Sequence, residues 1–356
     1  MELNNCPTCG GRVEFSPSDK KLKCEKCSNL FPIEYKSPKE KKRIVEAIHV
    51  DNDKGFEKWK ESKRTFQCKN CGAQIILNKF EMTSKCSYCN THSLVPTQDL
   101  PGLKPDAVIP FKISKEKANE QFKLRTKKKM FLPNDFKKNL PKTQIGATYL
   151  SSFSFGMDAF ATYDGIRAVS RTVTRRVHTA NGVRIVTDTV TDYVPFSGNI
   201  EKLFDDIVVE SSDKIEQYQI NSILPYYFKE CYEYNDDFLS GYSVGYYNQS
   251  IEDAVKVAEG QVLSTLDTII RNKHGNVTRL NIYPKYENQK YSYVLLPLYF
   301  INFKYKDKEY LNLMNGQTGV GSGSLPKSAT KITFFTLFII LIVVGLPLLI
   351  ILLSSL

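Results

Sequence analysis

The sequence predicts an α+β fold that consists of two small cysteine-rich modules, a larger domain rich in antiparallel strands, and one C-terminal apolar helix. Three observations support this prediction. Eight of the nine cysteines form a duplicated motif, residues 104–314 alternate between strand-like and helix-like patterns, and an uncharged apolar run lies near the C-terminus. The 356 residues are 42% hydrophobic and 24% charged, which is typical of a folded protein.

The eight cysteines from Cys6 to Cys89 occur as four Cys-x-x-Cys pairs. The first two pairs align with the last two, without a gap, at an offset of 62 residues. Two such pairs on facing hairpins direct four thiolates at one ion, which is the closed tetrahedral shell of structural zinc. We therefore predict two tandem zinc ribbons and two structural Zn²⁺ ions. The expected ligands are Cys6, Cys9, Cys24 and Cys27 for the first ion, and Cys68, Cys71, Cys86 and Cys89 for the second.

Disulfides and iron are the alternatives to zinc. The paired spacing and the polar start of the chain, which lacks a secretory signal, disfavour disulfides. Spacing separates zinc from iron poorly, because four thiolates bind both metals. Four cysteines leave no open coordination position, so the sites are predicted to be structural. Gly10 and Gly72 follow the first pair of each module and are expected to have positive φ. Cys231, in an aromatic stretch, is predicted to be a buried, inert thiol.

The domain organisation follows from these patterns and from changes in composition along the chain. The predicted units are zinc ribbon 1 at residues 1–35, a charged and solvated helical spacer at 36–65, zinc ribbon 2 at 66–100, the α+β domain at 104–314, a flexible linker at 315–331 and a transmembrane helix at 332–353.

Within the α+β domain, local patterns predict individual elements. Residues 108–111 have the pattern of a strand, and Ser114 is the expected N-cap of a helix that ends before Pro133. The dipeptide Asn181-Gly182 between two runs rich in Val, Thr and Arg, residues 167–179 and 183–194, predicts a β-hairpin.

A long amphipathic helix and a second strand pair are expected further along. Ser250 with Asp253 three residues later forms a capping signal. Residues 291–305 and 310–314 have strand patterns around a turn at 306–308. Apolar residues at helical spacing after Ser250 define the predicted buried face: Ile251, Ala254, Val255, Ala258, Val262, Leu266 and Ile269.

The apolar run from Ile332 to Leu353 contains 22 residues without a charge. As a helix it measures about 33 Å, enough to cross a hydrocarbon core of about 30 Å. Lys327 and Lys331 flank it on the N-terminal side only. The positive-inside rule therefore predicts a single-pass protein of the cell membrane whose N-terminal body lies in the cytoplasm. Membrane lipid is the partner expected for this helix.

The formal charge of +11 is concentrated around Lys123, Arg125 and Lys127–Lys129. This basic segment is either a solvated helix face or a surface that contacts anionic lipid. The four histidines form no metal or triad spacing, and the P-loop, H-E-x-x-H and G-x-S-x-G motifs are absent. We therefore expect no enzymatic activity.

Several motifs resemble those of a known family. They are Cys6–Gly10 together with the second cysteine pair, Pro105–Phe111, Lys128–Pro133, Leu295–Tyr299 and Asn315–Gly319. In these motifs the chain resembles bacterial membrane proteins with TFIIB-type zinc ribbons, which are sometimes labelled primosomal-helicase-like. The ATPase motifs that a helicase requires are absent, and Ser151–Phe153 stands where the family often has Pro-Phe-Trp.

The resemblance implies a membrane-bound scaffold. Relatives of this kind accompany phage-shock-type (PspA-like) and SPFH-domain proteins and help to hold the former at the membrane under envelope stress. The leading hypothesis is thus a non-enzymatic, tail-anchored adaptor that recruits cytosolic partners. The alternative is nucleic-acid binding by the ribbons, for which the first ribbon offers Arg12, Lys20, Lys21, Lys23 and Lys26.

Overall fold

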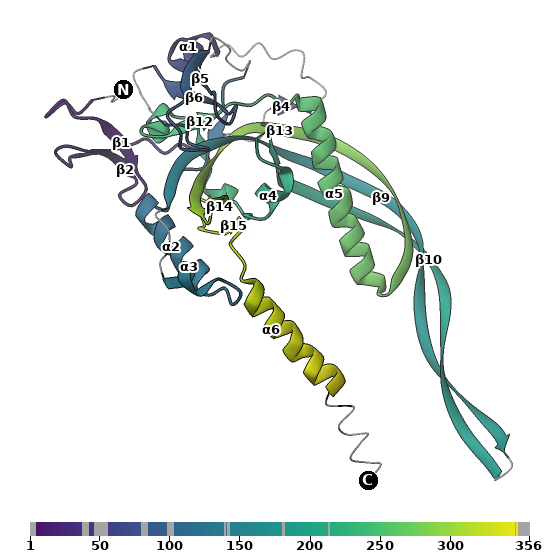
Figure 1. Ribbon diagram of the computed structural model, residues 1–356. Helices are drawn as coiled ribbons and strands as arrows, with labels where there is room; N and C mark the ends of the chain where they lie inside the picture. The colour runs from purple at the N-terminus through teal and green to yellow at the C-terminus, as the bar shows by residue number, and fades with distance from the viewer. Residues whose placement is uncertain are drawn as a thin grey trace.

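The structure is a computed structural model, and its elements are shown in Figure 1. It describes residues 5–37, 43–45, 56–79, 85–97, 103–138, 140, 143–179, 182–212, 214–345 and 347. Within these residues the fold is mixed α+β with two sheets whose pairings are mostly antiparallel, as the sequence predicts. The smaller sheet has three strands and the larger has twelve.

The larger sheet is built on three long strands. β9 (Gln144–Thr179) pairs antiparallel with β13 (Val277–Tyr305) along one edge and with β10 (Gly182–Glu210) along the other. The short strands that extend the sheet are β4 (Arg43–Ile44), β5 (Lys63–Cys68), β6 (Gln74–Asn78), β7 (Leu94–Thr97), β8 (Ala107–Val108), β11 (Tyr232–Glu233), β12 (Ser243–Gly245), β14 (Lys308–Asn315) and β15 (Gly321–Gly323).

The predicted hairpin is confirmed, but its strands are much longer than the sequence pattern indicated. The pairing of β9 with β10 runs from Thr179 opposite Gly182 to Ser152 opposite Glu210, with a bulge near Asp206. Gly165 lies within β9 and Gly198 lies within β10. In the sheet they are covered by the rings of Phe196 and Tyr163, which occupy the space that a Cβ atom would need. Of the predicted turn, residue 181 lies outside the described residues.

Helix α5 (Ile251–His274) lies along one face of β9, β10 and β13 (Figure 1). Its predicted N-cap is confirmed, because the Ser250 hydroxyl accepts the Asp253 N–H at 3.1 Å. The predicted apolar face is confirmed except at its end, where Ile270 is fully buried and Ile269 is only half-buried. Ile270 follows Leu266 by four positions, whereas Ile269 follows it by three, and here the four-position step keeps the side chain on the stripe that faces the sheet.

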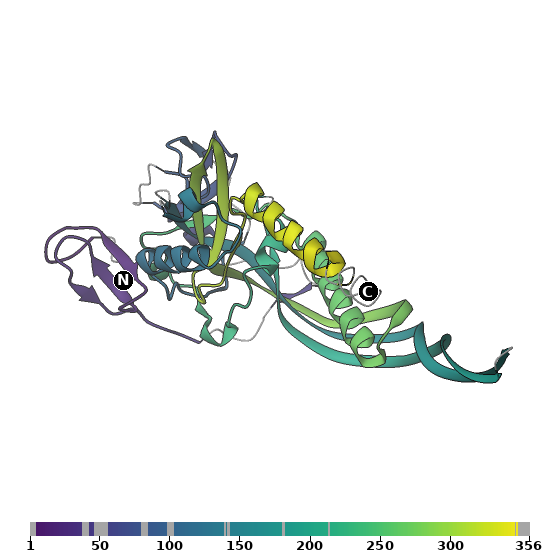
Figure 2. The same cartoon turned by 60° about the horizontal axis from the view of Figure 1, so that its bottom comes forward.

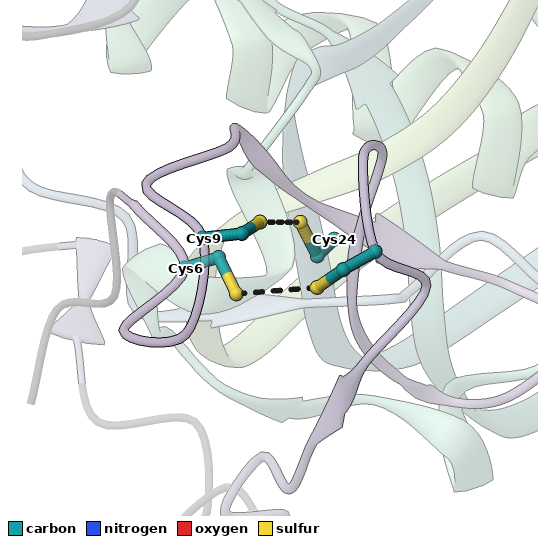
Figure 3. A group of neighbouring side chains, drawn as sticks. Cys6, Cys9 and Cys24 are labelled. Carbon is teal, nitrogen blue, oxygen red and sulfur yellow. Dashed lines mark hydrogen bonds between the residues drawn. The ribbon is translucent and has the colours of Figure 1, made fainter.

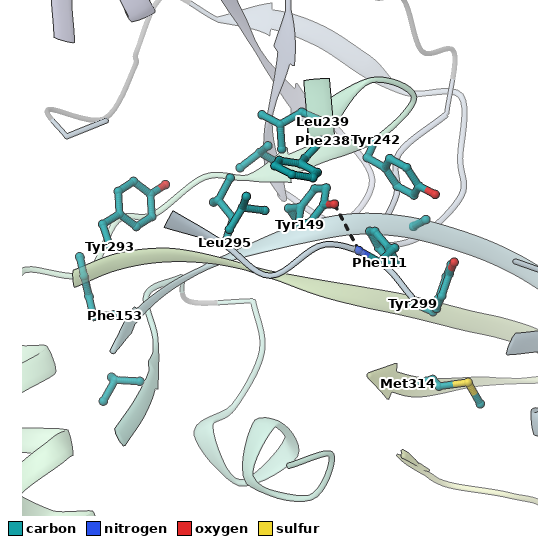
Figure 4. Packing of buried hydrophobic residues seen from close by; sticks show 14 of the residues in the cluster. Phe111, Tyr149, Phe153, Phe238, Leu239, Tyr242, Tyr293, Leu295, Tyr299 and Met314 are labelled. Carbon is teal, nitrogen blue, oxygen red and sulfur yellow. Dashed lines mark hydrogen bonds between the residues drawn. The ribbon is translucent and has the colours of Figure 1, made fainter. Parts of the chain in front are cut away.

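The other end of the sheet carries an aromatic core (Figure 4). Phe111 stacks on Tyr242 at a centroid distance of 4.4 Å, and Tyr149 and Tyr299 complete the cluster. The predicted strand at 108–111 is shorter, since β8 ends at Val108. Pro110 has no N–H to donate, and the Phe111 N–H is donated to the Tyr149 hydroxyl at 3.4 Å.

Two helices cover this core beside β13 and β14. Helix α2 (Lys115–Lys127) begins at Ser114, whose hydroxyl accepts the Lys117 N–H, so the predicted N-cap is confirmed. Helix α3 (Asn134–Lys138) follows, and its Phe136 packs against Phe303 of β13. The predicted turn between β13 and β14 is confirmed, with positive φ at Lys306 and Asp307. The short helices α4 (Gln217–Asn221), η2 (Phe228–Glu230) and η3 (Asp236–Leu239) lie in the connection between β10 and α5.

The charged segment 36–65 is not the solvated spacer that its composition indicated, where the structure describes it. Helix α1 (Phe56–Glu61) carries Trp59, which is only 5% exposed and donates its indole N–H to the Tyr234 hydroxyl at 2.8 Å. The buried Lys63 ammonium binds Asp236 and Asn78. Residues 38–42 and 46–55 of the predicted spacer lie outside the described residues.

The predicted flexible linker is also packed over its first part. Asn315 is fully buried, and its side-chain N–H groups donate to the carbonyls of Ile223 and Pro225, both at 3.0 Å. Its side-chain oxygen accepts the N–H groups of Gln317 and Thr318. Glycines near this turn suggested flexibility, but the side chain of one asparagine fixes the local backbone.

Helix α6 (Ala329–Ile340) continues into a π-helical turn, η4 (Leu341–Gly345). At the start of this helix, the Ser328 N–H donates to the Phe131 carbonyl and the Lys331 ammonium donates to the Leu132 carbonyl. Across the part of the chain that the structure describes, no helix combines the length and apolar character needed to cross a membrane. The predicted span extends beyond these elements, and its residues 346 and 348–353 lie outside the described residues.

Candidate metal centres

Four copies of one backbone turn position the eight cysteines. In each turn, the carbonyl of the first cysteine accepts the N–H of the residue four positions later, at 2.8–3.0 Å. That residue has a φ of +59° to +71° in every copy. The four residues are Gly10, Ser28, Gly72 and Asn90. Positive φ at Gly10 and Gly72 was predicted from the sequence, whereas Ser28 and Asn90 occupy the same conformation without being glycine.

The turns bring the sulfurs of each module together in pairs that face each other (Figure 3). In the first module the Sγ atoms of Cys6 and Cys27 are 3.5 Å apart, as are those of Cys9 and Cys24. The corresponding Sγ–Sγ distances in the second module are 3.6 Å for Cys68 with Cys89 and 3.7 Å for Cys71 with Cys86. All four sulfurs of a module lie within 4.8 Å of one another.

These distances fit a tetrahedral metal site. With metal–sulfur bonds of about 2.3 Å, the edges of a tetrahedron of four sulfurs measure about 3.8 Å. A disulfide has an S–S length of about 2.05 Å, and all of these cysteines are free. The two groups could therefore hold metal ions, and the eight predicted residues are brought together as expected.

The electrostatics of the two groups are those of crowded thiols. Loss of hydration raises the pKa of the Cys6 thiol, but the backbone N–H groups of Thr8 and Cys9 outweigh it and lower that pKa to about 6. The backbone N–H of Asn29 favours the Cys27 thiolate, but burial and the neighbouring thiols prevail and raise its pKa to about 12. Four thiolates at these distances repel one another, and a bound divalent cation removes that repulsion.

In the second group, too, burial disfavours the ionised thiols while hydrogen bonds favour them, and a threonine hydroxyl adds a further polar contact. The pKa of Cys68 is lowered to about 6: burial acts against the thiolate, but the Cys71 N–H and the Thr91 hydroxyl stabilise it. Burial raises the pKa of Cys71 to about 11. The Thr91 hydroxyl lies 3.0 Å from Cys89 Sγ and 3.5 Å from Cys68 Sγ. Sequence reasoning did not identify Thr91, and its only signal was its place two residues after a cysteine.

The first group belongs to a three-stranded sheet of its own. Its strands are β1 (Val13–Ser16), β2 (Lys21–Cys24) and β3 (Leu30–Phe31). This sheet docks on η3, where the Phe15 N–H donates to the Ser240 carbonyl at 2.9 Å and the Phe15 ring meets Phe238 edge-on. The contact is local, so the first ribbon stands at the side of the body (Figure 2).

The second group is part of the larger sheet. Strand β6 pairs with β12 through Ile75 and Ile76, and β12 pairs in parallel with β9 at Thr148 and Tyr149. Ile75 and Ile76 are buried, and β5 and β7 complete the edge. Tyr88 lies between Cys86 and Cys89 in the sequence. Its carbonyl accepts a hydrogen bond of 2.7 Å from the side-chain amide of Asn302 in β13.

Other candidate residues are placed as follows. Cys231 is buried, as predicted. In the basic segment, Arg125 is partly buried and donates to the Asn312 side chain at 3.0 Å, whereas Lys123 and Lys127–Lys129 are exposed. On the first ribbon, Arg12 lies 3.4 Å from Glu14 and Lys23 lies 3.8 Å from Asp19. Two of its five predicted nucleic-acid contacts are therefore engaged with carboxylates.

Among curated proteins, the chain is similar to YdjG of Bacillus subtilis (strain 168), which is described as an uncharacterized protein. The two sequences are 28% identical over 234 residues, which make up 65% of this chain and 66% of the relative. The match thus spans just under two thirds of the length of the relative. No family model matches the chain, and no solved structure matches it.

Proposed function

We propose that the protein is a non-enzymatic adaptor that is anchored in the cell membrane by its C-terminal apolar segment and recruits cytosolic proteins to the inner membrane face. The observation that carries the proposal is the environment of α6 and η4. None of their residues is buried.

The exposed side chains of this segment are large and apolar on all sides of the helix. Phe334 is 73% exposed, Phe338 is 58% exposed and Leu341 is 66% exposed. A helix that is apolar all round is stable when it is surrounded by lipid or by other protein, and water is a poor environment for it. With the uncharged sequence that continues to Leu353, the segment has the length of a membrane span.

Zinc is the metal proposed for both four-cysteine groups, in a structural role. Thiolate ligands and tetrahedral geometry suit Zn²⁺, and four protein ligands leave no position for a reacting water. The chain itself orients the sulfurs through the four turns described above. When bound, the metal supplies cross-links within two modules that have little apolar core of their own.

The resemblance to bacterial zinc-ribbon membrane proteins directs the search for partners. PspA-like and SPFH-domain proteins are the proposed candidates. The first ribbon is the proposed recruiting element, because it forms a sheet of its own and stands at the side of the body (Figure 2).

The test is to delete residues 332–356 and to follow both the chain and its partners by membrane fractionation. Partners are first identified by affinity purification from detergent-solubilised membranes. We expect the truncated chain and the partner to leave the membrane fraction together. A partner that stays at the membrane when the truncated chain does not would contradict the adaptor role.

Nucleic-acid binding is the second function to be tested, on the exposed Lys20, Lys21 and Lys26 of the first ribbon. The measurement is a salt titration of the full chain with duplex and single-stranded DNA. A complex that weakens steeply with salt would favour this function. The absence of a complex at micromolar protein would exclude this function.

A further inference from the structure

The two longest strands extend beyond the rest of the sheet as a two-stranded arm. Pairing of β13 with β9 ends where Val277 meets Arg167. Beyond this point β9 and β10 form strand pairs only with each other in the described chain, over residues 168–179 and 182–193, which we call the arm. At the base of the arm the Ala168 N–H also donates to the Asn276 carbonyl at 3.0 Å. Twelve residues per strand give the arm a length of about 40 Å. It leaves the body on the same side as α6 and away from the first ribbon (Figures 1 and 2).

The charges of the arm separate along its length. Both acidic residues lie in its inner half, where Asp192 binds Arg171 at 2.5 Å and Asp188 binds Arg175 at 2.8 Å. The outer part, residues 175–186, contains three arginines and a histidine and no acidic residue. In the described chain, Arg176 and Arg184 have no carboxylate partner. The tip therefore carries net positive charge.

Large apolar side chains are exposed at the same place. Ile185 is 65% exposed and Val183 is 58% exposed. The register places Ile185 opposite Arg176 and Val183 opposite His178, so apolar and basic groups share one face of the tip. An isolated two-stranded ribbon is marginally stable in water, and exposed β-branched residues at its end are a liability unless they are covered.

We propose that the tip of the arm binds the surface of a membrane that contains anionic lipid. Arginines are attracted to the headgroup phosphates, and Val183 and Ile185 enter the boundary between headgroups and acyl chains. The inference rests on the proposed anchor, because α6 and the arm leave the body on the same side. The arm then gives the body a second attachment, which limits its rotation about the single helix.

The test uses tryptophan fluorescence in the full-length chain. The protein has one tryptophan, the buried Trp59. An Ile185→Trp variant is reconstituted into vesicles of phosphatidylcholine and phosphatidylglycerol that carry bromine near the top of the acyl chains. Leu30→Trp, at an exposed position of the first ribbon on the other side of the body, is the matched control. We expect quenching at position 185 above that of the wild type and no added quenching at position 30.

A charge variant sharpens the result. Arg176→Glu/Arg184→Glu in the Ile185→Trp background is expected to reduce the vesicle-bound state of the tip by at least roughly fivefold for each arginine. Lys20→Glu/Lys21→Glu, which changes the net charge equally on the first ribbon, should leave the quenching unchanged. In vesicles of phosphatidylcholine alone, the Ile185→Trp chain should show the same reduced quenching as the arginine variant does in the mixed vesicles.

The outcomes distinguish the arm from the anchor. Resistance to alkaline washing reports the anchor, and quenching at position 185 reports the arm. If the chain stays in the membrane during the alkaline wash but shows no quenching at position 185, the arm proposal alone is overturned. If position 185 is quenched but alkaline washing removes the chain from the membrane, the anchor proposal alone is overturned. A fluorescence shift that depends on protein concentration in lipid-free detergent, without quenching in vesicles, would assign the tip to a second copy of the chain and also overturn the proposal.

Discussion

The two ribbons share one cysteine spacing but are used differently by the fold. The first forms a separate three-stranded sheet that touches the body through Phe15 and its neighbours. The second contributes strands β5, β6 and β7 to the twelve-stranded sheet of the body. The same cysteine turns therefore support a peripheral module in one case and an edge of the larger sheet in the other.

Aligned positions explain the difference. At the offset of 62 residues, Glu14 of the first ribbon corresponds to Ile76 of the second. Ile76 is 1% exposed and pairs with Val244 in β12. Glu14 instead lies against Gly241, where its side chain occupies the space that a Cβ atom would fill. An apolar residue at this position favours insertion into the sheet, whereas a carboxylate favours contact at the surface.

Removing one ligand from each ribbon should give the largest contrast. Cys68→Ser is expected to abolish cooperative folding of the body. Structural zinc, the metal proposed for this group, contributes about 10–16 kcal/mol in small modules, as much as a whole domain's stability. Cys6→Ser should release one metal and leave the main unfolding transition in place. The measurements are metal content per chain and thermal unfolding by circular dichroism. Equal shifts of the main transition in both variants would show that the ribbons are equivalent.

Truncation of aligned core residues should give a smaller contrast. Ile75→Ala is expected to lower the free energy of unfolding of the body by about 2–5 kcal/mol, because Ile75 is fully buried beside β12. Val13→Ala, at the equivalent position, should accelerate hydrogen exchange in β1 and β2 and leave the body unchanged. If Val13→Ala destabilises the body to the same extent, the first ribbon is not peripheral.

The smallest effect concerns Glu14 and depends on pH. Burial, followed by the Glu25 carboxylate, raises the pKa of Glu14, and the Arg12 guanidinium offsets only part of this. A carboxyl whose pKa is higher in the folded state destabilises that state when it ionises. The cost is therefore present above the folded-state pKa and disappears as pH falls through it.

Glu14→Gln should consequently increase the stability of the first ribbon by less than about 1 kcal/mol near neutral pH, and have no effect in mild acid. Protection factors of the β1 amides measure the change. The equivalent polar substitution in the second ribbon, Ile76→Gln, should strongly destabilise the body at every pH. A benefit of Glu14→Gln that persists in acid would rule out ionisation as its cause.

Sequence patterns predicted those features that depend on neighbours in the chain. The cysteine turns, the Ser114 and Ser250 caps and the face of α5 arise from spacings of a few residues, and the structure contains them. The full length of β9 and β10, the pairing of β6 with β12 and the burial of Trp59 depend on partners far along the chain. Such contacts leave no local period. Charge content therefore did not indicate the burial of Trp59 and Lys63 in segment 36–65, and glycine content did not indicate the packing of Asn315 at the start of segment 315–331. The metal's identity and the membrane span stay predictions.

The anchor is tested most directly by placing charges in the apolar helix. Phe338→Arg/Ile342→Arg puts two arginines into the segment, at about 2.5–3.5 kcal/mol each near the centre of a bilayer. Leu203→Arg/Tyr218→Arg is the control, because these residues are 73% and 69% exposed on the body. The fraction of chain that resists alkaline extraction from membranes is measured for both. We expect the helix variant to be lost from the membranes and the control to be retained. Full retention of the helix variant would contradict the proposal that this segment holds the protein in the membrane.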